Sequence, residues 1–328
     1  MEDKIKLTLK GLNHSDAKED EARQLLEGLR WPNGVICPRC ESKDVIEIVP
    51  NKDKKIRKGL YRCAECRRNN RTNQFTVTVG TIFEDSHIKL DIWLQAITLL
   101  CSSKKGFSAH QLHRQLGITY KSAWFMAHRI RYAMEQSPFK RRLKGTIEAD
   151  ETYIGGKARR IGNYRATENK TPVVSLVQRG GKVRSFVVPT VSARSLKQVL
   201  LDNVNPKSHL MTDEAHHYKR IGRKFASHEH VVHHKLEYVR GDITTNTVEG
   251  FFGLLKRGVN GTYHHISKEH LHRYLAEFDF RYNNRKVEDE ERTISAIAGF
   301  EGKRLMYKDS LGLTHGKENR NGKRNAND

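Results

Sequence analysis

Apolar residues recur every three to four positions through residues 86–136, and this spacing indicates helices rather than strands. Glycine-containing breaks near residue 106 and at residues 117–119 divide the stretch into three predicted helices. The last two, joined by a short turn with a glycine, fit a helix-turn-helix that reads DNA. The polar side of the last predicted helix, residues 120–134, carries four basic side chains: Lys121, His128, Arg129 and Arg131. The alternative is a small helical bundle with a solvated basic face.

From Gly145 onward the pattern changes to short β-branched runs separated by turn residues. It predicts five strands, at residues 146–150 (continuing into 151–154), 172–177, 183–191, 209–213 and 230–233. A helix at residues 195–201 separates the third strand from the fourth, and a long helix starts near Thr245. Three strands, a helix, two strands and a helix is the order of the ribonuclease H-like fold. We therefore expect an α/β domain over residues 144–290 with a mixed five-stranded sheet and helices.

The long helix near Thr245 has two distinct sides when its residues are placed about 100° apart. One is an apolar stripe that can pack on the sheet: Val248, Phe251, Phe252, Leu255 and Val259. The other is a polar stripe: Asn246, Glu249, Gly253 and Lys256. Lys256 follows Glu249 by two turns on nearly the same side, where it could hold a DNA phosphate. The alternative is an ordinary amphipathic helix with incidental charges.

Three acidic residues stand in separate parts of this predicted domain: Asp150, Asp213 and Glu249. Carboxylates brought together from distant segments can hold two divalent ions about 4 Å apart on a phosphodiester. Oxygen ligands suit Mg²⁺ or Mn²⁺. The His216-His217, His233-His234 and His264-His265 pairs are not expected to be ligands, because adjacent side chains point apart.

The N-terminal part predicts a helix at residues 15–29, within a first region of residues 1–30, and then a small zinc ribbon at residues 31–82. Cys37-Pro-Arg-Cys40 and Cys63-Ala-Glu-Cys66 could present four thiolates to one structural Zn²⁺. Short β-like runs at residues 45–49, 59–62 and 75–79 would complete the ribbon. The alternatives are unligated thiols or two redox pairs. Cys101 lies in an apolar helical run and is expected to be a core residue.

The charge balance favours a polyanionic partner, because 60 Lys and Arg face 38 Asp and Glu for a net charge of +22. Double-stranded DNA is the leading candidate, and a basic protein without such a partner is the alternative.

The sequence shows no run of about 18 apolar residues and no secretory signal, so we expect a cytoplasmic protein associated with the nucleoid and not with a membrane. Residues 138–142 are expected to be a basic linker, and residues 303–328 a basic, flexible tail.

Several long, ordered motifs over roughly residues 20–287 resemble one known family. They are Arg30-Trp-Pro-Asn-Gly34 with the first cysteine pair, Glu148-Ala-Asp-Glu-Thr-Tyr-Ile-Gly-Gly156, Thr244-Thr-Asn-Thr-Val-Glu-Gly-Phe-Phe-Gly-Leu-Leu-Lys-Arg257, Gly261-Thr-Tyr-His-His265 and Phe280-Arg-Tyr-Asn-Asn-Arg285. The chain resembles bacterial insertion-sequence transposases of the DDE type, in the group with an N-terminal zinc ribbon.

This resemblance implies a DNA transposase that cuts at the ends of an insertion sequence and joins the freed 3′-hydroxyl to target DNA. It implies Asp150 and Asp213 as ligands of two Mg²⁺ ions. The third ligand is Glu249 or Asn246, and we prefer Glu249 because a third negative ligand offsets more positive charge. The zinc ribbon and residues 86–136 would recognise the terminal inverted repeats, and a homodimer or larger assembly would hold two ends. Residues expected to contact DNA are Lys121, Arg129, Arg131, Lys256, Arg257, Arg273, Arg281 and Arg285.

Two other functions remain open at this point. One is a domesticated transposase that binds a specific DNA sequence as a regulator without cutting it. The other is a structure-selective nuclease, such as a junction resolvase, with the same fold.

Overall fold

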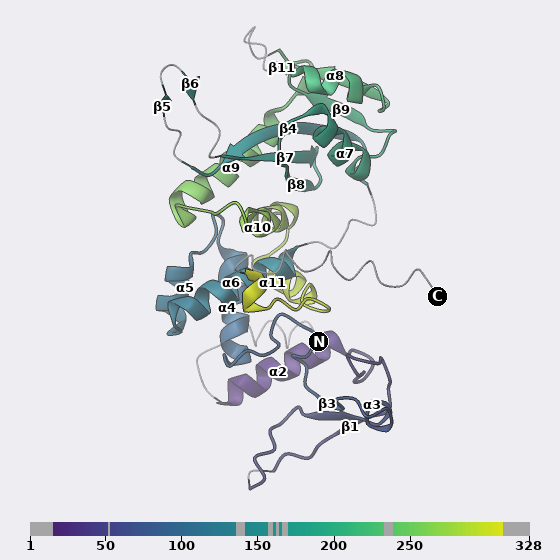
Figure 1. The fold of residues 1–328 in the computed structure, drawn as a ribbon, viewed down its shortest axis with the longest axis vertical. Helices are drawn as coiled ribbons and strands as arrows, with labels where there is room; N and C mark the ends of the chain where they lie inside the picture. Colours follow the sequence, from purple (N-terminus) through teal and green to yellow (C-terminus); the bar gives the residue numbers. More distant parts are fainter. Residues whose placement is uncertain are drawn as a thin grey trace, which may run out of the picture. The chain divides into compact units, whose positions relative to one another are not determined.

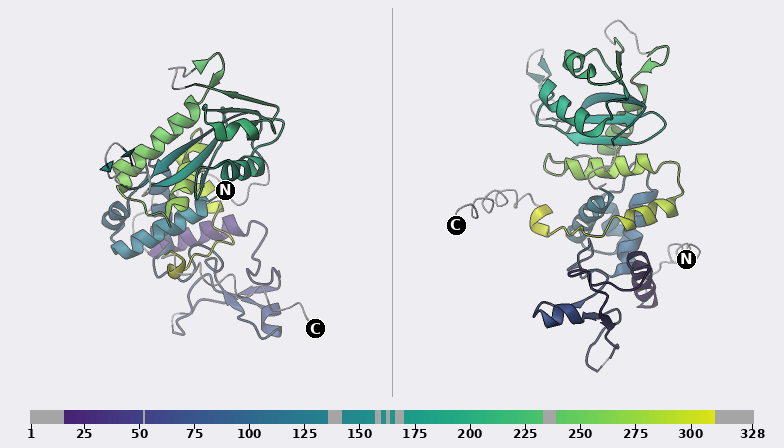
Figure 2. Two further views of the ribbon diagram at one scale, coloured as in Figure 1. Left: turned by 45° about the horizontal axis from the view of Figure 1, so that its top comes forward. Right: turned by 90° about the vertical axis from the view of Figure 1, so that its right-hand side faces the viewer.

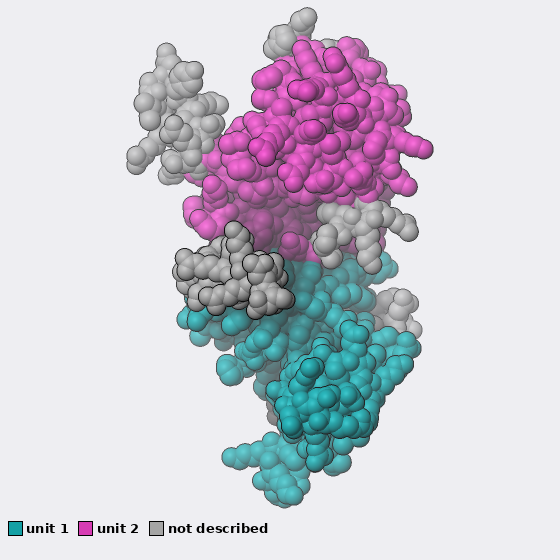
Figure 3. Space-filling model, turned by 45° about the vertical axis from the view of Figure 1, so that its right-hand side comes forward, with its two compact units in different colours: residues 1–102, 109–133, 288–328 teal, residues 103–108, 134–287 magenta. Residues whose placement is uncertain are grey.

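A computed structural model describes residues 16–51, 53–135, 142–156, 160–161, 164–165, 170–232 and 239–310 (Figures 1 and 2). The chain divides into two compact units, coloured separately in Figure 3. Unit 1 comprises residues 1–102, 109–133 and 288–328, and unit 2 comprises residues 103–108 and 134–287. Most of the expected linker at residues 138–142, the 233–234 histidine pair and the tail beyond residue 310 lie outside the described residues.

The N-terminal part of unit 1 holds helix α2 (Asp16–Arg30) and a three-stranded antiparallel sheet of β1 (Val45–Glu47), β2 (Tyr61–Cys63) and β3 (Gln74–Phe75). A short helix, α3 (Ala64–Arg68), follows β2. The expected strand at residues 75–79 is wrong beyond Phe75, where the chain turns. The reason lies in α2: the guanidinium of Arg30 donates to the carbonyls of Val77 and Val79 at 2.7 and 2.8 Å, which satisfies them without a sheet partner.

The helical part of unit 1 contains α4 (Leu90–Ser102), α5 (Ala109–Leu116) and α6 (Tyr120–Met134), close to the predicted positions. Of the four basic side chains predicted on the polar side of α6, however, His128, Arg129 and Arg131 are buried, and only Lys121 is exposed. C-terminal residues cover this region: α11 (Asp289–Ala298) packs against α4, and the short α12 (Tyr307–Ser310) follows. The unit is therefore closed by residues from the far end of the chain.

Unit 2 is built on a mixed five-stranded sheet with the order β10-β9-β4-β7-β8. Strands β4 (Thr146–Ile154), β7 (Thr171–Gln178) and β8 (Val183–Val187) pair antiparallel, whereas β9 (His209–Thr212) and β10 (Ser227–His230) run parallel to β4. The expected strand 146–150 and its continuation form one nine-residue strand. The fifth strand ends at His230, earlier than predicted.

Helices cover both faces of this sheet. One apolar cluster joins sheet residues such as Val173 and Val183 to α9 (Asn246–Gly258) and α10 (Leu271–Asn283). The other joins Val174 and Leu176 to α7 (Ala193–Asn203) and α8 (His216–Gly222). The whole predicted apolar stripe of α9, from Val248 to Val259, lies in the first cluster and is confirmed.

Some elements of unit 2 were not predicted. They are α8, α10, the two-residue strands β5 (Arg160–Ile161), β6 (Tyr164–Arg165), β11 (Val239–Arg240) and β12 (Ile243–Thr244), and a π-helical turn, η2 (Val259–Tyr263).

Helix α10 protects the sheet edge: Asn283 accepts from the Val183 amide at 2.7 Å and donates to its carbonyl at 3.1 Å. Bonding the backbone of β8 in this way keeps an edge strand from pairing with another chain.

Candidate active site and zinc centre

Asp150 and Asp213 lie at corresponding positions of two neighbouring parallel strands. The register of β4 and β9 pairs Glu148 with Met211. Continuing that register by two residues brings Asp150 on β4 level with Asp213, which directly follows β9. Because carboxylates at the same level of adjacent parallel strands are neighbours, these two acids can serve one site.

Glu249 reaches the same region from α9, which packs on β4 and β7. The side chain is exposed, and the hydroxyl of buried Thr245 donates to its Oε1 at 2.7 Å. This hydrogen bond holds one oxygen of the carboxylate against the start of α9. Alternation along β4 places Asp150 on the sheet face that carries the α9 cluster, so both acids lie on one side of the sheet.

The acids interact electrostatically as well as by position. Burial raises the pKa of Asp150 to about 7, opposed by the backbone amide of Glu151, while the charges of Glu151, Asp213 and Glu249 raise it further. Repulsion among these carboxylates disfavours the charged form of Asp150. A bound divalent cation would offset this repulsion, and oxygen donors are those that Mg²⁺ or Mn²⁺ prefers. The residues present therefore fit such an ion.

Glu151 is a further acid that the sequence reasoning did not select. Alternation turns it to the opposite face of β4 from Asp150, where the hydroxyl of buried Tyr218 on α8 donates to its carboxylate. Burial raises the pKa of Glu151 to about 7, partly offset by this hydrogen bond, and the charge of Asp213 raises it as well. The sequence alone did not distinguish it from its neighbour Asp150, because two adjacent acids look like one motif. Only the alternation of side chains along β4 places them on opposite faces of the sheet.

The remaining predicted residues of α9 occupy its two ends. Asn246 is exposed in the first turn, and its backbone amide donates to the hydroxyl of Thr244 at 3.0 Å. Lys256 and Arg257 are exposed in the last turn. Between these ends, a Cβ atom placed on Gly253 would meet no atom within 4 Å, so this part of the helix surface is open.

The structure corrects four of the predicted DNA contacts, because their guanidinium groups are buried. These are Arg129, Arg131, Arg273 and Arg281. Arg129 donates to the carbonyls of Leu305 and Glu84 and lies over the Phe125 ring at 4.9 Å. Arg281 forms an ion pair with buried Glu277, one turn earlier on α10. Charged groups in such positions hold the protein interior together and are not available to phosphates.

The other predicted DNA contacts lie at the surface. Lys121 is exposed, with its ammonium group 4.7 Å from the centre of the Tyr307 ring. The side chain of Arg285 stacks on Tyr282 at 4.0 Å and donates to the carbonyls of Gly181 and Tyr282. Arg285 is thus exposed but already engaged in fixing the turn between β7 and β8.

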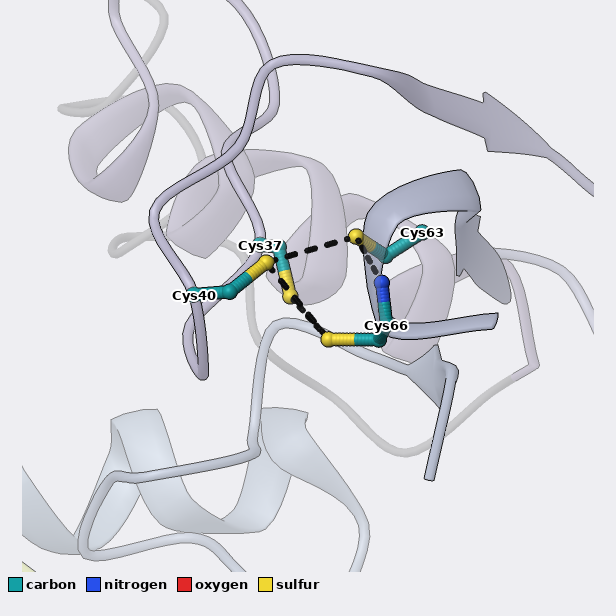
Figure 4. A group of neighbouring side chains, drawn as sticks. All are labelled: Cys37, Cys40, Cys63 and Cys66. Carbon is teal, nitrogen blue, oxygen red and sulfur yellow. Dashed lines mark hydrogen bonds between the residues drawn. The ribbon is translucent and has the colours of Figure 1, made fainter. Parts of the chain in front are cut away.

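The four cysteines of the ribbon converge on one point (Figure 4). Their sulfur atoms all lie within 4.8 Å of one another, with Cys40–Cys63 at 3.5 Å and Cys37–Cys66 at 3.8 Å. A tetrahedral site with Zn–S bonds of about 2.3 Å requires sulfurs about 3.8 Å apart. In the part of the chain that the structure describes, no other group of three or more metal-binding side chains is this close.

Electrostatics agrees with a metal at this position. Burial and the neighbouring thiols raise the pKa of Cys66 to about 12, so this thiol stays protonated unless a cation binds beside it. A Zn²⁺ ion deprotonates the thiols that coordinate it. None of the five cysteines forms a disulfide, and buried Cys101 is a core residue as expected. The cysteine cluster therefore supports one structural zinc ion.

Comparison with known families agrees with this arrangement. Residues 142–283 match the ISXO2-like transposase domain, and residues 17–69 match the transposase zinc-ribbon domain. A protein in the transposable element ISH50 of Halobacterium salinarum is 29% identical over 287 residues, which cover 80% of this chain and 90% of that protein. A transposase-like protein of Haemophilus influenzae is 28% identical over 109 residues, 33% of this chain and 87% of that protein.

The two matches and the cysteine cluster thus define a protein with a zinc ribbon and a DDE-type transposase domain. The chain belongs to the insertion-sequence transposases of the IS1595 group, which combine these two domains. Within the described residues, no helix has both the length and the apolar character needed to cross a membrane.

Proposed function

We propose that this protein is a DNA transposase that cleaves DNA at the ends of its insertion sequence and joins the freed 3′-hydroxyl to target DNA. The observation that carries the proposal is the placement of Asp150 and Asp213 at the same level of neighbouring parallel strands, with α9, which carries Glu249, packed on the same face of the sheet as Asp150. All three lie inside the segment that matches the transposase domain. Burial chiefly, and then the charges of Glu151, Asp213 and Glu249, raise the pKa of Asp150, so these carboxylates lie close enough to interact electrostatically.

The strand arrangement supports a ribonuclease H-like assignment for unit 2. Three antiparallel strands, β4, β7 and β8, precede two strands that lie parallel to the first. In that fold the acids occur on the first strand, after the fourth strand and on a later helix. Asp150, Asp213 and Glu249 have these positions in the element order.

In this proposal the three carboxylates hold two Mg²⁺ or Mn²⁺ ions. When bound, such a pair activates the attacking oxygen and stabilises the leaving one, in hydrolysis and in strand joining alike. Glu249 is the proposed third ligand because Thr245 already orients its carboxylate. Asn246 lies one turn earlier and would support the site, while Lys256 would hold a DNA phosphate at the other end of the helix.

DNA recognition is assigned to both units. The zinc ribbon and the helical part of unit 1 would bind the terminal inverted repeats, with Lys121 as an exposed contact in α6. In unit 2, Lys256 and Arg257 would neutralise phosphates near the acids, and Arg285 could add a contact from its fixed position. Helices α5 and α6 are proposed to form a helix-turn-helix. Its exposed basic surface is smaller than the sequence predicted, because Arg129 and Arg131 are buried. A dimer or larger assembly would bring the two ends of the insertion sequence together. The proposed location is the cytoplasm, at the nucleoid.

The test is cleavage of DNA carrying the element's own ends, with and without Mg²⁺. We expect Mg²⁺-dependent nicking at the end by the wild-type protein, and loss of nicking with retained DNA binding in Asp150→Asn. A pre-cleaved end should then be joined to a second DNA. Retained nicking in Asp150→Asn would contradict the assignment of the site.

The same assays separate the other two functions. A regulator descended from a transposase would bind the ends specifically but would not cut them at any Mg²⁺ concentration. A structure-selective nuclease would cut branched DNA regardless of end sequence and would not join a pre-cleaved strand.

A further inference from the structure

Glu148 is a buried acid in the middle of β4, two residues before Asp150. Because side chains alternate along a strand, it faces the same side of the sheet as Asp150, toward α9. Its exposed fraction is 0%, and a buried carboxylate is costly unless each acceptor position is filled. The donors that fill these positions show what this residue does.

Four donors converge on the Glu148 carboxylate, two on each oxygen. Oε1 accepts from the Arg179 guanidinium at 2.7 Å and from the Thr247 hydroxyl at 2.8 Å. Oε2 accepts from the backbone amides of Thr247 and Val248 at 2.8 and 3.0 Å. The two amides belong to the first turn of α9, whose N–H groups have no partner inside the helix. The carboxylate of a strand residue therefore caps this helix.

This saturation separates Glu148 from the proposed metal ligands. A carboxylate offers about four lone-pair positions, and here all of them are used. Glu148 thus has no acceptor left for a cation, although it stands next to Asp150 in the motif. Its negative charge also favours the positive end of the helix dipole.

Arg179 extends the same anchor to the segment that leads into α9. Besides its bond to Glu148, its guanidinium donates to the carbonyls of Asp242 and Thr244 at 2.6 and 3.0 Å. Asp242 directly precedes β12, and Thr244 is its last residue, two positions before α9 begins. One ion pair therefore fixes both the approach to α9 and its first turn against the central strand.

We propose that Glu148 is the positioning residue that sets Glu249 opposite Asp150. Glu249 directly follows Val248, the second of the two anchored amides, so the helix cannot shift along β4 without breaking the anchor. Asp150 lies on the same strand as Glu148, two residues away. The separation of the two acids is thus fixed through one buried carboxylate. This inference rests on the proposed function of the acidic site.

The test measures Mn²⁺ binding to the full-length protein by electron paramagnetic resonance, alongside cleavage of end DNA as a function of Mn²⁺. Two variants weaken the anchor: Glu148→Gln places an amide NH₂ among donors, and Thr247→Val removes one donor but keeps both backbone amides. Glu269→Gln, at an exposed position of unit 2, is the matched control.

For Glu148→Gln we expect Mn²⁺ affinity to fall about 10- to 100-fold, the range found when partners of metal ligands are changed. Cleavage should fall with it and recover partly at high Mn²⁺, while binding of end DNA stays unchanged. Thr247→Val should show the same changes at smaller size, and Glu269→Gln none. Recovery at high Mn²⁺ marks positioning, because a general loss of folding would not respond to the metal.

The outcomes are distinct. If Asp150→Asn binds Mn²⁺ as the wild type does, the acidic site itself is wrong and the inference falls with it. If Mn²⁺ binding depends on Asp150 but both anchor variants match the control within twofold, the positioning role alone is overturned. Should Glu148→Gln fail to fold, Thr247→Val decides by the same criterion.

Discussion

At the scale of single residues, burial decides what each charged side chain does. Arg281 and Arg257 look alike in a basic sequence, yet one is buried against Glu277 and the other is exposed at the end of α9. Arginine is suited to both tasks, since its guanidinium forms directional hydrogen bonds with carboxylates and phosphates alike. A high net charge therefore overstates the number of residues that can reach DNA.

This difference predicts opposite effects for two substitutions. Arg281→Met leaves Glu277 buried without its ion-pair partner and should destabilise unit 2 by about 3–5 kcal/mol. The salt dependence of DNA binding should not change. Arg257→Gln should leave the melting temperature unaltered and reduce the slope of log K against log salt by about one. Thermal unfolding and binding at several salt concentrations measure both. A reduced slope in a well-folded Arg281→Met protein would contradict the structural role.

A second residue-scale prediction concerns Asp279 on α10, which is partly buried. Burial raises its pKa to about 7, although the amide and hydroxyl of Ser185 donate to it and Arg184 lies near. The folded protein thus holds a proton on this group that the unfolded chain releases above pH 3.8. Its contribution to stability is complete below that pH and is lost as pH rises through about 7, by about 4 kcal/mol at most.

Asp279→Asn should therefore flatten the pH dependence of stability. Relative to the wild type, the variant should gain in free energy of unfolding between pH 5 and pH 8, because its side chain does not ionise. Denaturant unfolding at these two pH values gives the difference directly, and the other acids with raised pKa cancel in the comparison. Equal slopes in both proteins would show that Asp279 is ionised throughout.

At the scale of elements, the zinc ribbon depends on its metal more than on its sheet. Its three strands have only two or three residues each, too few to hold the loops together by backbone pairing. Three rings form its small core, with Trp31 at 5.6 Å from Tyr61 and 6.1 Å from Phe75. Most of the folding energy of such a unit comes from the ion.

We expect about one zinc per chain by atomic absorption, and none bound at the ribbon after Cys63→Ser or strong chelation. Amide signals of residues 31–82 should then lose their dispersion in NMR spectra. Signals from the sheet of unit 2 should stay in place, since its apolar clusters contain no residue of the ribbon. A dispersed ribbon spectrum without metal would mean that the aromatic core suffices.

At the scale of the whole molecule, the chain crosses between the units and returns. Unit 1 is completed by residues 288–328, so the helix that follows unit 2 in the chain belongs to the same unit as the N-terminal part. Residues Thr293, Ala296, Ile297 and Phe300 are buried, and α11 packs on α4. The C-terminal part is therefore structural up to at least Leu305, where a flexible basic tail was expected from residue 303.

Truncation after Val287 tests this organisation. The shortened chain exposes the apolar surface of α4 that α11 covers, and it should lose the thermal transition of unit 1 or shift it markedly downward. Hydrogen exchange in β4, β7 and β9 should remain slow, because those strands belong to unit 2. Truncation after Ser310, which keeps α11 and α12, is the control. Unchanged melting of the shorter chain would contradict a structural role for α11.

Local patterns in the sequence were enough to place many elements. The bounds of α6, the nine residues of β4 and the apolar stripe of α9 follow from helical or alternating periodicity, which depends on near neighbours only. Short elements such as β11, β12 and α8 were not predicted, because segments of two to seven residues are too short to show a repeating pattern of apolar positions. The turn at residues 76–79 was misread as a strand because its partner, Arg30, is distant in sequence.

By itself, the sequence determined which residue types are present for chemistry: four cysteines at metal-binding spacing and three acids in separate segments. It also determined the helices and strands that carry them, since hydrophobic periodicity is a local property. The tertiary structure alone decided which arginines are internal, that α11 closes unit 1, and that Glu148 caps α9 while Glu151 faces the other side of the sheet. Those outcomes depend on burial and on partners up to 191 residues away, which no local pattern encodes.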